Sequence, residues 1–122
     1  MTAGELVTAF IRALERKDLD AACAMVTADC AYDNVPFAKV YGPDAIRGVL
    51  EPFLGACSGV DWVVHHQAET ADIVMNERTD RFEMGGTRRE LRVAGLFVGR
   101  EGKIARWRDY FDLGQFTAAM GG

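Results

Sequence analysis

The chain has 122 residues, of which 49% are hydrophobic and 26% charged, and its formal net charge is −4. A chain of this length is expected to fold as one domain, residues 1–122, burying roughly two-thirds of its unfolded surface. The acidic balance argues against nucleic acid or an anionic membrane as the main partner, because both bind basic surfaces. No apolar run reaches the ~18 residues needed to cross a bilayer, and no signal-peptide pattern opens the sequence. We therefore expect a cytoplasmic protein.

The cysteines and histidines do not form a motif typical of metal binding or redox chemistry. Cys23, Cys30 and Cys57 are odd in number and lack C-x-x-C spacing, which favours reduced thiols over disulfides. His65 and His66 are adjacent on a predicted strand, so they should face opposite ways, a poor arrangement for a metal. We expect both histidines to be structural or surface residues, and we expect neither a metal nor a cofactor.

A first helix is predicted from the start of the chain to about Lys17. Thr2 followed by Glu5 is the pattern of a capping box, in which the two residues satisfy each other's backbone N–H groups. The apolar residues that follow recur at helical spacing, which predicts one buried face. They are Leu6, Val7, Phe10, Ile11 and Leu14.

Two more helices and a strand are predicted before residue 57. A short helix fits Leu19–Val26, and a strand within 30–37 should end before Pro36, because a residue before proline favours extended backbone. Residues 41–56 carry apolar residues at helical spacing and are entered through a Gly-Pro pair. Pro52 inside this third helix predicts a kink or an early break.

From Gly59 onward the hydrophobic period changes from 3.6 to 2, which predicts strands. The separators GGTR and REGK carry glycines suited to hairpin turns, and Asp112 with Gln115 predicts a cap for a final helical turn. Helices followed by a strongly curved antiparallel meander define an α+β fold, in which the sheet forms a cone around the helices. Such a cone has an apolar interior suited to a small molecule. The extended segments are 60–69, 71–84, 87–99 and 103–111.

Alternation places charged residues on the inner face of two strands. In 73–84, Arg78 and Asp80 share a face with Val74 and Phe82. In the last strand, Ala105, Trp107, Asp109 and Phe111 form the less polar, inward face. The opposite, outward face holds Ile104, Arg106, Arg108 and Tyr110.

A carboxylate inside an apolar cavity is costly unless it is paired. Arg78 between Asp80 and Asp109 can donate to both through its planar guanidinium. A simpler interpretation exists for each motif alone: an R-x-D pair is usually a solvated face, and WRDYFD is typical of a charged edge strand. Both interpretations stay open at this point.

Three segments, AYDNVPF, NERTDRF and GKIARWRDYFDLGQF, resemble in order and spacing the catalytic segments of the limonene-1,2-epoxide hydrolase family. The similarity runs from about Leu19 to Phe116. This family belongs to the nuclear transport factor 2-like, or SnoaL-like, superfamily. The resemblance therefore implies a curved, mixed, mostly antiparallel sheet that forms a cone around N-terminal helices.

The resemblance also implies a role for each matching residue. Tyr32 and Asn34 would hold the attacking water by hydrogen bonds. Asp109 would be the base that activates this water, and Asp80 the acid that protonates the oxirane oxygen. Arg78 would bridge the two acids. Such chemistry needs opposite protonation states in two groups, which a pair of carboxyls can supply.

These inferences predict a cofactor-independent epoxide hydrolase that converts an apolar epoxide and water to a vicinal diol by direct, one-step attack of water. The sequence contains neither the G-x-S-x-G nor the H-E-x-x-H motif. A homodimer is also expected. The alternatives are an isomerase or cyclase of the ketosteroid isomerase or SnoaL type, or a non-catalytic module for ligand binding and dimerisation. The predicted substrate-binding residues are Phe53, Phe82, Leu91, Val93, Trp107, Phe111 and Phe116.

Overall fold

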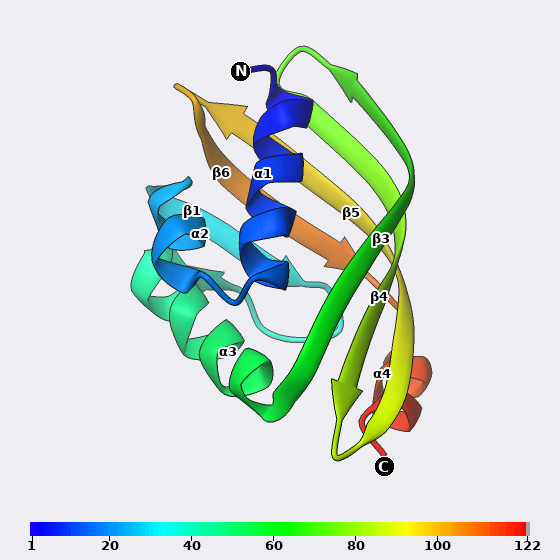
Figure 1. The fold of residues 1–122 in the computed structure, drawn as a ribbon. Coiled ribbons are helices and arrows are strands. Elements are labelled where there is room, and N and C mark those ends of the chain that lie inside the picture. The colour runs from blue at the N-terminus through cyan, green and yellow to red at the C-terminus, as the bar shows by residue number, and fades with distance from the viewer. Residues whose placement is uncertain (122) are drawn as a thin grey trace.

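The computed structural model describes residues 1–121, which form four helices and a six-stranded sheet. Figure 1 shows the strongly curved sheet with α1, α2 and α3 on its concave side, and α4 near the end of the β4–β5 hairpin. No helix of the described residues is long and apolar enough to cross a membrane. The helices are α1 (Ala3–Glu15), α2 (Leu19–Ala24), α3 (Gly42–Ala56) and α4 (Leu113–Ala119). The strands are β1 (Val26–Asn34), β2 (Val40–Tyr41), β3 (Cys57–Thr70), β4 (Ile73–Met84), β5 (Thr87–Arg100) and β6 (Lys103–Tyr110).

The strand order is β2-β1-β6-β5-β4-β3. Every neighbouring pair is antiparallel except β1 and β6, which run parallel as the second and third strands in this order. The sheet is open at β2 and β3. The predicted fold class, a mixed and mostly antiparallel sheet curved around N-terminal helices, is therefore confirmed.

The N-terminal helix begins at the predicted capping box. Thr2 Oγ1 accepts from the backbone N–H of Glu5 at 3.0 Å, and Glu5 accepts from the N–H of Thr2 at 2.8 Å. The helix ends at Glu15, and Lys17 follows in the left-handed region at φ 59°. All five apolar residues predicted for its inner face are buried against the concave side of the sheet.

One helix boundary differs from the prediction, and one break offered for another helix is absent. The second helix ends at Ala24, and Val26 instead begins β1, where it pairs with Ile104 of β6. The third helix continues through Pro52 to Ala56, so no early break occurs. Burial of Leu50 and Leu54 on either side holds this helix against the core despite the missing backbone N–H of proline.

Because of a β-bulge, the side chain of Ile104 lies on the opposite side of the sheet from the one predicted. The register of β5 with β6 jumps from Val98–Arg106 to Gly99–Ile104, which leaves Ala105 unpaired. An extra residue reverses the alternation on one side of the bulge. Ile104 is therefore fully buried rather than outward, whereas Arg106 is exposed as predicted.

A second bulge corrects the prediction for the two histidines. Val64 pairs with Arg78 and His66 with Glu77, so His65 is the unpaired residue. The His65 ring lies 2.8 Å from Thr79 Oγ1, and the His66 ring lies 3.0 Å from Glu77. Both rings therefore lie on the convex face, and both side chains are exposed.

The last helix, α4, is attached to the sheet by few contacts. Its N-terminus is capped by Asp112, which accepts from the N–H of Gln115 as predicted, and none of its residues is fully buried. Arg89 on β5 donates to the carbonyl of Ala119 at 3.0 Å and to that of Met84 at 3.2 Å. Phe116 packs on Phe37 and Phe111. Arg89 thus joins α4 to the β4–β5 hairpin.

We expect Arg89→Met to loosen α4, because the substitution keeps the apolar stem and removes both hydrogen bonds. Chymotrypsin cleavage after Phe111 and Phe116 should accelerate about five- to tenfold, because of the two bonds only the one to Ala119 holds α4, and its loss is that of one hydrogen bond. Arg88→Met, at the exposed neighbouring position, is the matched control and should leave the cleavage rate unchanged. Equal cleavage of the two variants would show that Arg89 does not hold this helix.

Candidate active site

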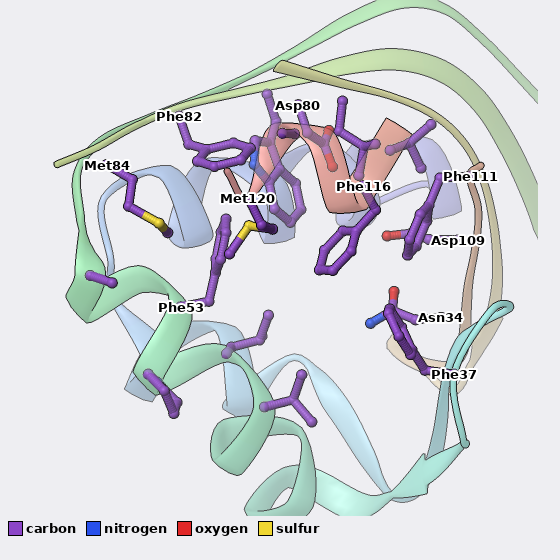
Figure 2. A pocket seen from close by; sticks show the side chains of 18 of the residues that line it. Asn34, Phe37, Phe53, Asp80, Phe82, Met84, Asp109, Phe111, Phe116 and Met120 are labelled. Carbon is purple, nitrogen blue, oxygen red and sulfur yellow. The ribbon is translucent and has the colours of Figure 1, made fainter. Parts of the chain in front are cut away.

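A cavity of about 500 Å³ opens between the concave face of the sheet, α3 and α4. Figure 2 shows Phe53 and Phe82 next to each other at one end of it, where their rings pack in a T-shaped contact, with Asp80, Asp109 and Asn34 along its wall. Of the predicted substrate-binding residues, six line the cavity: Phe53, Phe82, Leu91, Val93, Phe111 and Phe116. Further apolar lining comes from Phe37, Val49, Leu50, Pro52, Ala56, Met84, Ala119 and Met120.

Arg78 binds both aspartates from behind this wall. Its Nε and Nη2 donate to the two carboxylate oxygens of Asp80, at 2.7 and 3.2 Å, and Nη2 also donates to Oδ2 of Asp109 at 2.7 Å. Asp80 lies two residues beyond Arg78 on β4, and Asp109 lies on β6, with β5 between the two strands. The guanidinium therefore spans β5 to reach the second acid.

The three charged groups are almost completely buried. Arg78 is 1% exposed, Asp109 4% and Asp80 7%, so each depends on the others to satisfy its charge. Burial alone would lower the pKa of Arg78, but the carboxylates of Asp109 and Asp80 raise it further than burial lowers it. The Arg78 guanidinium also lies 5.1 Å from the centre of the Trp62 ring, at cation–π distance.

Asp80 is the acid whose protonation the site favours. Burial raises its pKa to about 7, which exceeds the opposing effect of the charge and hydrogen bonds of Arg78. Asp109 and Glu15 add to the rise because they are like charges. Near neutral pH a substantial fraction of Asp80 thus carries a proton and can donate it into the cavity.

Tyr32 and Asn34 lie beside Asp109 because β1 runs parallel to β6. In this register Tyr32 is opposite Trp107, and Asn34 is opposite Asp109. The amide nitrogen of Asn34 donates to the hydroxyl of Tyr32 at 2.9 Å. Burial, followed by the charge of Asp109, raises the pKa of Tyr32, so its hydroxyl stays protonated. The two polar groups therefore line the cavity next to Asp109.

Trp107 does not occupy the predicted position in the lining. It is fully buried, its Nε1 donates to Oδ1 of Asp109 at 3.0 Å, and its ring stacks on Tyr32 with centroids 3.9 Å apart. Phe10 of α1 packs on its edge. Trp107 therefore contacts the acid from the core side, while Asp109 itself lines the cavity.

Three residues of this region were not identified from the sequence. Trp62 on β3 pairs with Asp80 and lines the cavity. Asn76 accepts a hydrogen bond from Nη1 of Arg78 at 3.2 Å. Gly95 on β5 lies next to Arg78, where a Cβ atom would be 2.5 Å from Nη1. By strand alternation Asn76 shares the inner face of β4 with Arg78, two residues away, and this spacing is the signal that could have indicated the contact.

The cysteines lie outside this constellation. Cys23, Cys30 and Cys57 are all free, and burial raises the pKa of each thiol, that of Cys30 to about 12. Thiols with raised pKa values are poor nucleophiles at neutral pH. Within residues 1–121, no three His, Cys, Asp or Glu side chains form a group that could hold a metal ion.

The chain thus combines an α+β fold with a curved sheet, an apolar cavity and a pair of aspartates bridged by an arginine. Residues 2–120 match the model of the limonene-1,2-epoxide hydrolase catalytic domain. The chain belongs to this family and is an epoxide hydrolase of the limonene-1,2-epoxide hydrolase type.

Similar proteins agree with this assignment. The chain is 34% identical over 107 residues to the epoxide hydrolase EphG of Mycobacterium tuberculosis, which covers 88% of this chain and 71% of that protein. The structure of an LEH-like epoxide hydrolase from M. tuberculosis superposes with a TM-score of 0.85 at 32% identity, over 98% of this chain and 90% of that one. A protein of ketosteroid isomerase-like fold from Catenulispora acidiphila has the same TM-score at 23% identity, over 99% and 95% of the two chains, and shows the fold alone.

The raised pKa of Asp80 predicts how stability depends on pH. The folded protein binds the Asp80 proton more tightly than the unfolded chain does. The contribution of this group to the free energy of unfolding is therefore lost as pH rises toward 7. Between pH 5 and pH 8, the free energy of unfolding of the wild type should fall by about 3 kcal/mol relative to Asp80→Asn. Urea denaturation at several pH values measures this difference.

Leu54→Ala is the control, because it destabilises the core without removing a carboxyl group. The difference in free energy of unfolding between this variant and the wild type should stay constant across the same pH range. A constant difference between wild type and Asp80→Asn would contradict the raised pKa of Asp80.

Proposed function

We propose that the enzyme opens an apolar epoxide to a vicinal diol by direct, one-step attack of water. The observation that carries this proposal is the guanidinium of Arg78 bound to Asp80 and Asp109 at the wall of an otherwise apolar cavity. Epoxide opening needs one protonated and one ionised acid, because a base must act at the water and an acid at the leaving oxygen.

Asp109 is the base in this proposal. Oδ1 of Asp109 accepts from Trp107 and Oδ2 from Arg78, so the carboxylate is fixed in orientation. The attacking water would bind between Asp109, Asn34 and the hydroxyl of Tyr32, which line the cavity together. As the water oxygen bonds to an oxirane carbon, one of its protons passes to Asp109.

Asp80 is the general acid. The C–O bond of the oxirane breaks as the new bond forms, and its oxygen takes the proton of Asp80. Asp109 then holds the proton taken from water and Asp80 is ionised, so one proton must return from Asp109 to Asp80 before the next turnover. Arg78 stays bound to both acids and stabilises whichever one carries the negative charge.

The lining of the cavity supports an apolar substrate. Among its lining residues within the described chain, the polar groups are those of Tyr32, Asn34, Trp62, Asp80 and Asp109, and the remainder are aliphatic, aromatic or thioether side chains. These polar groups belong to the chemistry or lie next to it. Binding energy for the rest of the substrate must therefore come from apolar contact.

The experiment that tests the proposal is hydrolysis of limonene oxide or cyclohexene oxide in ¹⁸O-labelled water, with enzyme in excess over epoxide. Direct attack places ¹⁸O in the diol during the first turnover. A covalent ester would instead transfer an unlabelled carboxylate oxygen in that turnover. Unlabelled diol would contradict the proposal. The proposal would also be contradicted if neither epoxide formed diol faster with the enzyme than in buffer alone.

Asp80→Asn and Asp109→Asn test the assigned roles separately. Each should lower kcat at least about 10²-fold, because each removes one acid–base function while preserving side-chain shape. Asp61→Asn, on the exposed part of β3, is the matched control and should retain full activity. Circular dichroism checks that each variant is folded. More than a tenth of the wild-type kcat in either active-site variant would refute its assigned role.

A further inference from the structure

One hydrogen bond of Arg78 goes to neither catalytic acid. Nη1 donates to Oδ1 of Asn76 at 3.2 Å, whereas Nε and Nη2 serve Asp80 and Asp109. Asn76 lies two residues before Arg78 on β4 and is 5% exposed. It does not line the cavity, so any effect of Asn76 on the reaction must act through Arg78.

A chain of side-chain amides fixes the orientation of Asn76. Its Nδ2 donates to Oε1 of Gln67 on β3 at 3.2 Å, and Nε2 of Gln67 donates to the carbonyl of Gly4 at 3.3 Å. Because Gly4 offers only an acceptor there, the amide oxygen of Gln67 must face Asn76. Asn76 must then present its NH₂ group to Gln67 and its oxygen to Arg78.

Gly95 leaves the space in which this hydrogen bond forms. It is opposite Asn76 in the register of β4 with β5 and opposite Asp109 in that of β5 with β6. A Cβ atom at this position would lie 2.5 Å from Nη1 of Arg78 and 2.9 Å from Oδ1 of Asn76. Any side chain larger than that of glycine would therefore displace one of the two hydrogen-bonding atoms.

The neutral amide also suits the electrostatics of the site. Arg78 is one cation that faces two acids. A third carboxylate at position 76 would compete with them for the guanidinium and would further disfavour the ionised form of Asp80. Asn76 satisfies Nη1 without adding charge.

We propose that Asn76 is a positioning residue of the epoxide hydrolase, which with Gln67 holds the Arg78 guanidinium in the orientation that bridges Asp80 and Asp109. This inference rests on the roles assigned to Arg78 and the two acids under the proposed function. It extends the active site to a relay that ends on the first turn of α1.

Asn76→Leu tests the relay, because it keeps the size of the side chain and removes both of its hydrogen bonds. We expect kcat to fall about tenfold, the loss of one charge-assisted hydrogen bond, with KM changed less than about twofold. Thr79→Val is the matched control: it removes a hydrogen-bonding group from the same strand on the convex face and should leave kcat unchanged.

Asn76→Asp separates positioning from a merely structural role. The groups that face Asp80 are Arg78 on its own strand, Asp109 from β6, Tyr32 from β1 and Glu15 from α1. A further carboxylate at position 76 should move the alkaline limb of the kcat/KM profile upward by about one pH unit, because it weakens the hold of Arg78 on Asp80. If Asn76 had only a structural role, this substitution would change thermal stability and leave the alkaline limb of the pH profile unshifted.

Hydrogen exchange of the Arg78 guanidinium, followed by NMR, gives a readout that does not depend on turnover. The Nη1 hydrogens should exchange about tenfold faster in Asn76→Leu than in the wild type. Unchanged exchange together with an unmoved pH limb in Asn76→Asp would overturn the inference. If Asn76→Leu does not fold, the aspartate variant decides alone. If the wild type forms no diol, the proposed function fails, and the exchange rates still decide whether Asn76 positions Arg78.

Discussion

The active site depends on one buried cation that binds two buried carboxylates. Removing Arg78 would leave two buried carboxyl groups without a cation among apolar side chains, which is among the most destabilising changes a core can undergo. The trio, which carries the acid–base chemistry in the proposed mechanism, is therefore also a stability problem. The surrounding structure solves it with hydrogen bonds from Trp107 and to Asn76, and with space provided by Gly95.

The curvature and register of the sheet bring these groups together. Arg78 reaches from β4 across β5 to Asp109 on β6, and it can do so because β5 carries glycine at the crossing point. The parallel pairing of β1 with β6 then places Asn34 directly opposite Asp109. Fold alone does not select a chemistry, since similar cones serve other reactions. In this chain the chemistry follows from which side chains point into the cone.

Strand alternation was sufficient to predict the inner face of β4 and the inward direction of Asp109. The α+β class and the first helix followed from periodicity and a capping box, which are local signals, whereas the mixed sheet was implied by the resemblance to a known family. The facing of Ile104 and of the two histidines could not be predicted in the same way, because each depends on a β-bulge that is fixed by pairing between strands. Gly95 and Trp62 were missed for a related reason. Each contacts Arg78 from another strand, and only the register reveals those contacts.

In the proposed mechanism this arrangement keeps one acid protonated near neutral pH while a second carboxylate lies next to it. The most direct test is the ¹³C chemical shift of the Asp80 carboxyl carbon, followed by NMR from pH 4 to pH 9 and assigned with Asp80→Asn. This carbon is expected to titrate near pH 7, because burial raises the pKa of Asp80 to about 7. Titration that is complete below pH 5 would show that Asp80 is ionised at neutral pH, and would contradict its role as the acid.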